Sequence, residues 1–166
     1  MTQADPQTQA GGGNPAMFCY QCEQTAKGNG CTSWGVCGKD PETAALQDLL
    51  VHACKGIGQY AHRAAELGAS DPDIGRFVNE ALFVTLTNTN FDPEAVGEWV
   101  LEAAEVRDKA RQLYESAARD AGQEPEQLSG PAAFQPADDL GGLVSQGEGV
   151  SIQDRIEELG PDAAGL

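Results

Sequence analysis

Apolar residues recur at helical spacing in three separate stretches of this chain. Side chains three or four positions apart lie on one face of a helix, so each stretch predicts a helix with one buried face. The three stripes are Leu46, Leu49, Leu50, Ala53, Ile57, Tyr60, Ala61 and Ala64; then Ile74, Phe77, Val78, Ala81 and Leu82; then Val96, Trp99, Val100, Ala103, Val106, Ala110, Leu113 and Tyr114.

An Asp-Pro pair followed by an acid precedes each stripe. Asp40-Pro41-Glu42, Asp71-Pro72-Asp73 and Asp92-Pro93-Glu94 each offer a capping aspartate, a proline suited to the first helical turn and an acid that favours the positive end of the helix dipole. Gly68 and Gly122 are placed to end the first and third helices. We therefore predict a mainly α fold, an antiparallel three-helix bundle over residues 40–122.

The two flanks of the bundle have a different composition. Residues 1–16 are mostly Gln, Gly, Pro and Ala, with too little apolar surface to offset the entropy of ordering, so a disordered tail is expected. Residues 122–149 contain nine Gly or Pro and are expected to be loop, with one short helix over 152–159. Residues 123–166 thus read as a loop-rich linker that leads into a second, truncated bundle.

Between the tail and the bundle, residues 17–39 hold most of the cysteines. Two, eight and five residues separate Cys19, Cys22, Cys31 and Cys37, and glycines are frequent between them. Thiols gathered in one short loop have three explanations: two disulfides, a tetrahedral zinc site or an iron–sulfur cluster. We expect this loop to cap one end of the bundle.

The spacing favours the cluster over its alternatives. Disulfides suit small secreted proteins, but no signal peptide is visible and a fifth cysteine would stay unpaired. Zinc sites usually take two C-x-x-C pairs, and only Cys19 and Cys22 form one. A close pair followed by two wider-spaced cysteines lets one loop surround a compact cluster, and glycines let backbone amides approach its sulfides.

Three stretches also resemble a known family, namely MFCYQCEQTAKGNGCTSWGVCGKDPETAALQDLL, LQDLLVHACKGIGQYA and LFVTLTNTNFD. They are similar to the N-terminal part of the hybrid-cluster (prismane) proteins, which are hydroxylamine reductases. The resemblance implies that Cys19, Cys22, Cys31 and Cys37 bind a 4Fe–4S cluster. In the family this cluster relays electrons to a hybrid iron–sulfur–oxygen cluster, which reduces hydroxylamine to ammonia or, in another proposed role, nitric oxide.

The resemblance also implies what this chain lacks. In the family the hybrid cluster is held by cysteines, a histidine and glutamates from later in the protein, whereas here no cysteine follows Cys54 and no histidine follows His62. We expect the N-terminal, electron-entry portion of such an enzyme, inactive alone, with a redox protein as electron donor and a small nitrogen compound as substrate of the full-length protein. The alternatives are a stand-alone iron–sulfur electron carrier and a structural zinc-binding module.

Charge excludes some partners. The formal net charge is −16, from 26 acidic and 10 basic residues, which argues against nucleic acid and anionic membranes as partners. No apolar stretch approaches the roughly 18–20 residues of a membrane span. A cytoplasmic location is expected.

Several other residues invite interpretation. Cys54 is expected to be a small buried hydrophobe, and His52 and His62 to be solvated helix histidines. Tyr20 and Trp34, inside the cysteine loop, are expected to shield the cluster from water.

Two polar stretches have plain structural interpretations. Residues Thr87 to Asn90 are expected to form a turn, because Thr and Asn side chains bond to nearby backbone. Glu102, Glu105 and the charged run from Arg107 to Arg111 are expected to form the exposed face of the third helix.

Overall fold

The computed structural model describes residues 17–86, 89–152, 156 and 159–160. The expected tail, residues 1–16, lies outside these ranges, as does most of the short helix expected over 152–159. In chain order the elements are the 3-10 turn η1 (Ala26–Gly28), α1 (Pro41–Glu66), α2 (Pro72–Val84), α3 (Pro93–Asp120), the 3-10 turn η2 (Gly130–Ala133) and α4 (Leu140–Glu148).

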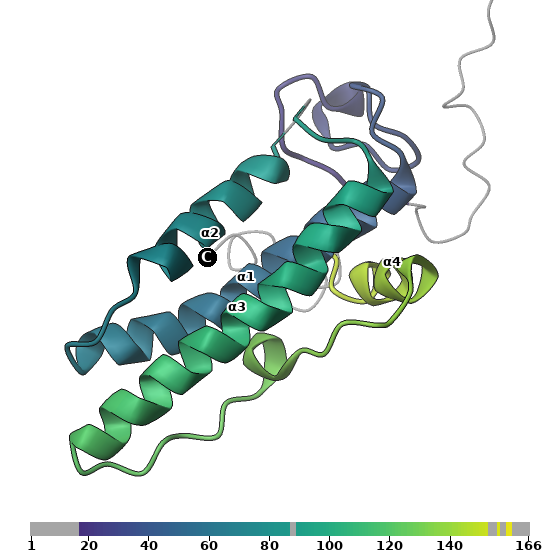
Figure 1. The fold of residues 1–166 in the computed structure, drawn as a ribbon. Helices are drawn as coiled ribbons and strands as arrows, with labels where there is room; N and C mark the ends of the chain where they lie inside the picture. The colour runs from purple at the N-terminus through teal and green to yellow at the C-terminus, as the bar shows by residue number, and fades with distance from the viewer. Residues whose placement is uncertain (1–16, 87–88, 153–155, 157–158, 161–166) are drawn as a thin grey trace, which may run out of the picture.

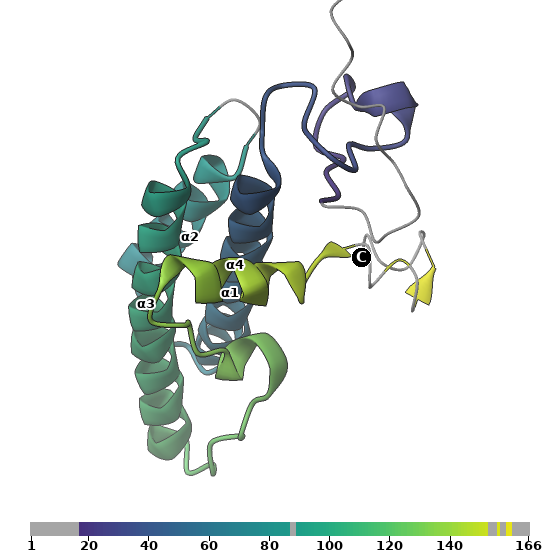
Figure 2. The same ribbon diagram turned by 90° about the vertical axis from the view of Figure 1, so that its right-hand side faces the viewer.

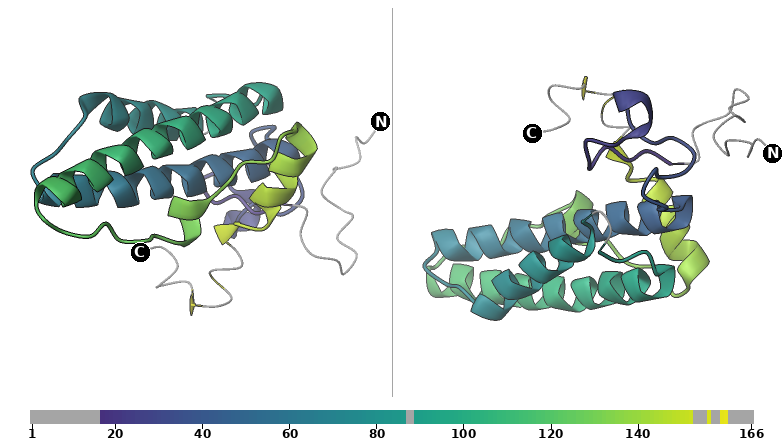
Figure 3. Two further views of the ribbon diagram at one scale, coloured as in Figure 1. Left: turned by 60° about the horizontal axis from the view of Figure 1, so that its bottom comes forward. Right: turned by 90° about the horizontal axis from the view of Figure 1, so that it is seen from above.

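Three helices form the body of the molecule, which confirms the mainly α prediction. The long helices α1 and α3 run side by side in the same direction. The shorter α2, which comes between them in the chain, runs in the opposite direction (Figure 1). Of all element pairs, α1 and α3 share the largest contact. The cysteine loop lies at the end of the bundle where α1 begins, as Figure 3 shows from above.

The three Asp-Pro signals start the helices as predicted. The carboxylate of Asp40 accepts a hydrogen bond from the amide of Thr43 at 2.7 Å, and Asp71 and Asp92 cap α2 and α3 in the same way. Each satisfies an amide that has no partner within the helix, which stabilises the helix by about 1 kcal/mol. At the other end of α1, Gly68 takes a positive φ of 81°, a conformation that glycine adopts without strain.

The core forms where the predicted stripes meet. Ile57 of α1 and Val96 and Val100 of α3 are fully buried between the two long helices. One residue of the second stripe does not follow the prediction: Leu82 is 40% exposed. The buried face of α2 continues instead through Ala81 and Val84, which flank Leu82 in sequence.

The stretch expected to be loop contains a fourth helix. Helix α4 lies across α1 and α3 (Figure 2), and η2 packs against α1. Asp139 caps α4 through the amide of Gly142 at 2.8 Å. Glycines have low helix propensity, so the sequence of this segment did not predict a helix. They allow close packing, however, because a Cβ at Gly147 would overlap the backbone carbonyl of Ala45 in α1.

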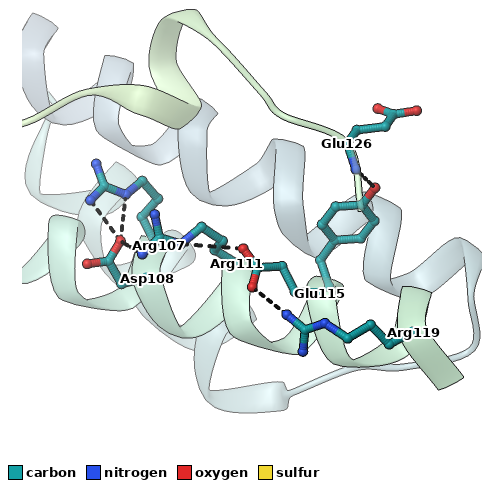
Figure 4. Close-up of polar contacts among 7 residues, drawn as sticks. Arg107, Asp108, Arg111, Glu115, Arg119 and Glu126 are labelled. Carbon is teal, nitrogen blue, oxygen red and sulfur yellow. Dashed lines mark hydrogen bonds and ion pairs between the residues drawn. The ribbon is translucent and has the colours of Figure 1, made fainter. Parts of the chain in front are cut away.

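One charged residue of α3 is buried, against expectation. Only 3% of Arg107 is exposed, and its guanidinium donates to the carbonyl of Phe134 and to Asp108 (2.8 Å), next to the exposed ion pairs of Arg111, Glu115 and Arg119 (Figure 4). The exposed-face prediction is therefore wrong for Arg107. Its side chain instead fastens the segment after η2 to α3.

Two further expectations can be compared with the structure. The turn expected at Thr87 to Asn90 is seen only in part, since 87–88 lie outside the described residues; the amide of Thr89 donates to the carbonyl of Leu86 at 3.2 Å. Among the described residues, no helix combines the length and apolar character needed to cross a membrane.

Candidate metal centre

The cysteine loop is fastened by its own backbone. Cys19 and Cys31 form an isolated antiparallel bridge, with amide-to-carbonyl distances of 3.0 and 2.8 Å. Met17 and Cys31 pack against Ala44 of α1 in a small apolar cluster separate from the main core. This packing holds the loop to the first turn of α1.

Glycines make the turns that bring the loop back on itself. Gly30 has a φ of 108°, and a Cβ there would lie 2.7 Å from the Phe18 ring. The amide of Gly35 donates to the carbonyl of Lys39 at 2.7 Å, which closes the turn that contains Cys37. A side chain at Gly30 would be strained by this positive φ and would meet the Phe18 ring, so glycine is favoured there.

The four loop cysteines are all free thiols, so the disulfide alternative is not realised in this structure. Cys31 is buried, while Cys19, Cys22 and Cys37 are partly exposed. In the described part of the chain, no three Cys, His, Asp or Glu side chains lie close enough together to hold a metal ion. A shared metal would require the sulfurs to approach one another, and the ligand assignment stays a prediction.

The donor set nevertheless suits an iron–sulfur cluster. Such clusters take four thiolates, and the loop offers four unpaired thiols, of which the bridged Cys19 and Cys31 have fixed backbones. A buried ammonium beside Cys19, described below, supplies the positive charge that a group of thiolates would need. Cys19, Cys22, Cys31 and Cys37 are therefore the residues that could hold a metal or cluster.

Two aromatic residues do not take the role expected of them. Tyr20 is 65% and Trp34 49% exposed, so both face solvent. The apolar cover of the loop comes instead from Met17, which packs with Cys31 against Ala44 of α1. The shielding prediction is wrong for Tyr20 and Trp34.

Sequence reasoning missed Lys39. A lysine just before a helix cap would ordinarily be solvated, but this one is 2% exposed. Its Nζ donates to Oε1 of Gln21 at 3.1 Å and lies 3.8 Å from Sγ of Cys19. The only signal in the sequence is its place two residues after the last loop cysteine.

A pocket of about 550 Å³ opens between the loop, α1 and the segment after α4. Cys19, Lys39 and Asp48 line it together with apolar side chains, including Val51 and Val150. Burial raises the pKa of Asp48 to about 6, although the charges of Lys39 and Lys55 act in the opposite direction. The pocket thus joins the cysteine loop to a carboxyl group that titrates near neutral pH.

The remaining candidates fall into two groups. Cys54 is buried in the main core, and burial raises its thiol pKa to about 11, so it is an inert hydrophobe as predicted. His62 is exposed beside Glu66, as expected. His52 is not: its ring packs edge-on against Phe134, with the centroids 5.6 Å apart, and burial lowers its pKa.

Comparison with known proteins agrees with this architecture. The family model described as "Prismane/CO dehydrogenase family" matches residues 17–148, the cysteine loop and the helices after it. Proteins named hydroxylamine reductase are similar: that of Rhodospirillum rubrum is 51% identical over 150 residues, and that of Acidithiobacillus ferrooxidans 50% over 153 residues. The hydroxylamine reductase of Geobacter sulfurreducens is 50% identical over 133 residues.

The coverage of these alignments is unequal. They include 90%, 90% and 79% of this chain but only 27%, 28% and 24% of the relatives. The chain therefore spans about a quarter of the length of the curated relatives it matches. On the match to residues 17–148, the chain belongs to the Prismane/CO dehydrogenase family.

Proposed function

We propose that this chain is the N-terminal electron-transfer portion of a hydroxylamine reductase of the hybrid-cluster type. Cys19, Cys22, Cys31 and Cys37 bind a 4Fe–4S cluster. The observation that carries the proposal is the presence of four free cysteines on one loop, fastened by the Cys19–Cys31 bridge, in a member of this family.

The bound cluster would supply one-electron redox chemistry. The residues of the chain have simpler roles: the thiolates bind, the bridge orients Cys19 and Cys31, and Met17 and Ala44 exclude water from the inner side of the loop. Amides near the sulfurs would favour the reduced, more negative state.

The complete enzyme would use this cluster to pass electrons onward. An electron-donor protein would deliver them, and a hybrid cluster bound by later residues would reduce hydroxylamine or nitric oxide. This rests on the names of the relatives and on the family, since the chain covers about a quarter of their length.

The experiment is a metal and sulfide analysis of a cysteine series. Purified without oxygen, the chain should contain about four iron and four sulfide. Each of the substitutions Cys19→Ser, Cys22→Ser, Cys31→Ser and Cys37→Ser should reduce both contents well below that level. Cys54→Ala is the matched control, because Cys54 lies in the core and should leave both contents unchanged.

Two results would contradict the proposal. One is a colourless chain with a single zinc and no sulfide, which would favour the structural zinc module. The other is full iron and sulfide content in the four serine variants, which would mean that other groups bind the iron.

A further inference from the structure

Lys39 is held in place by its backbone and by close packing. Its carbonyl accepts the amide of Gly35, and a Cβ at Gly35 would lie 3.0 Å from Cβ of Lys39. The residue directly precedes Asp40, the cap of α1. Its position is therefore fixed from both sides, by the loop and by the helix.

The ammonium of Lys39 is buried, and among the described residues both of its direct side-chain contacts are neutral. Its hydrogen-bond acceptor, Gln21, is neutral, and its other contact is the sulfur of Cys19. In the described part of the chain, no carboxylate forms an ion pair with it. Asp48 is within electrostatic range, and because burial raises its pKa to about 6, its carboxyl is largely neutral in mildly acidic solution and ionised above that pH.

A buried cation whose direct contacts are all neutral is costly. An anion at Cys19 would remove this cost, because the sulfur lies 3.8 Å from the ammonium nitrogen. A cluster held by four thiolates carries negative charge in either oxidation state and gains one more when it accepts an electron. The position of the charge therefore fits the proposed ligand better than it fits the empty loop.

We propose that Lys39 is the countercharge of the cluster bound at Cys19, and that it makes one-electron reduction of that cluster more favourable. This rests on the proposed function. No bond is made or broken: an external one-electron reductant such as dithionite supplies the electron, and the ammonium keeps its proton. Lys39 touches a cluster ligand and acts through it, so it is a positioning residue.

The test uses the complete chain and three substitutions. Lys39→Met removes the charge but keeps the apolar stem, Lys39→Arg keeps the charge, and Lys27→Met makes the same charge change at an exposed position of the same loop. Three quantities are measured for each: iron and sulfide content, midpoint potential by dithionite titration followed by electron paramagnetic resonance, and stability of the cluster-free chain in urea.

Three results are expected. The equilibrium constant for reduction should fall about tenfold in Lys39→Met, a shift of about 59 mV to more negative potential. It should change little in Lys39→Arg and Lys27→Met. At pH 5, where the pKa of about 6 leaves the Asp48 carboxyl largely neutral, the cluster-free Lys39→Met chain should be at least as stable as the parent, because it removes a buried charge without an anionic partner.

The outcomes that contradict the inference are separate from those that contradict the proposed function. A parent chain without iron and sulfide overturns the proposed function. A parent with a normal cluster, together with an unchanged potential in Lys39→Met, overturns the role of Lys39 alone. So does a cluster-free Lys39→Met chain that is less stable than the parent at pH 5, or a chain that fails to fold, since Lys39 would then be a structural residue.

If Lys39→Met folds but does not retain the cluster, Lys39→Arg decides the matter. Retention by Lys39→Arg supports the countercharge. Equal loss in both variants contradicts it.

Discussion

At Asp48, burial and charge act in opposite directions. Burial disfavours the carboxylate more than Lys39 and Lys55 favour it, so folding raises the pKa from 3.8 to about 6. The folded chain then binds this proton more tightly than the unfolded chain does. The carboxyl group supports folding fully below about pH 4 and loses that contribution as the pH rises through 6.

Asp48→Asn should therefore stabilise the folded chain in alkaline solution. The ionised carboxylate costs on the order of 2–3 kcal/mol at pH 8, and the neutral amide avoids most of it. Urea unfolding of both chains at pH 8 and at pH 4 tests this: the variant should be more stable at pH 8, and the difference should fade by pH 4. The exposed Glu80→Gln makes the same charge change and should alter the free energy of unfolding by less than about 0.5 kcal/mol at either pH.

Arg107 and Arg111 allow a paired comparison on one helix. Arg107 is buried and donates to the carbonyl of Phe134, whereas the side chain of Arg111 is 45% exposed. Arg107→Met leaves a carbonyl without its donor and should lower the free energy of unfolding by about 1–3 kcal/mol. Arg111→Met should cost less than about 1 kcal/mol, because exposed ion pairs contribute little. Equal losses in the two variants would show that the buried contact contributes no more to the free energy of unfolding than the exposed ion pairs do.

Roles that depend on neighbouring residues could be predicted from the sequence, whereas burial by distant elements could not. The capping role of Asp40 depends on the residues that follow it directly and could be predicted. The burial of Lys39 and Arg107 and the partial burial of His52 depend on elements distant in sequence, such as the Phe134 segment that contacts the last two. A polar side chain normally indicates solvent, so no local pattern could have placed these three against other elements.

At the scale of elements, η2 approaches the backbone of α1 closely at one glycine. A Cβ at Gly56 of α1 would overlap the backbone carbonyl of Pro131 in η2, whereas a Cβ at Gly58 would meet nothing within 4 Å. Both glycines lie inside the same helix, two positions apart. Alanine substitutions at these two positions therefore measure the cost of lost packing and the gain in helix propensity separately.

Gly56→Ala should destabilise the chain by about 1–3 kcal/mol, because η2 must move away from α1. Gly58→Ala should stabilise it by about 0.5–1 kcal/mol, since alanine has the better helix propensity. Thermal unfolding followed by circular dichroism gives both signs in one experiment. A stabilising Gly56→Ala would mean that η2 does not pack on α1 in solution.

The same contrast explains which helices the sequence predicted. The first three combine an Asp-Pro start with an apolar stripe, two local signals that agree. Helix α4 has a capping Asp139 but a glycine-rich body, and these signals conflict. What favours the helix there is contact with α1, and a single-stretch argument does not include that contact.

At the scale of the whole molecule, the candidate site combines local and distant contributions. The identity and spacing of Cys19, Cys22, Cys31 and Cys37 are local, and the sequence supplied them together with the family resemblance. The inner cover by Met17 and Ala44 and the buried Lys39 arise where the loop meets α1. Sequence reasoning placed the cover on Tyr20 and Trp34 because it could not tell which loop side chains face the helix.

The four loop thiols are proposed to bind a single 4Fe–4S cluster together. Native mass spectrometry of the chain purified without oxygen, combined with thiol alkylation, tests it most directly. The predicted mass increase is that of four iron and four sulfide, with Cys19, Cys22, Cys31 and Cys37 protected until the cluster is removed and alkylated afterwards. A mass increase of one zinc, or alkylation of these cysteines while iron stays bound, would contradict the claim.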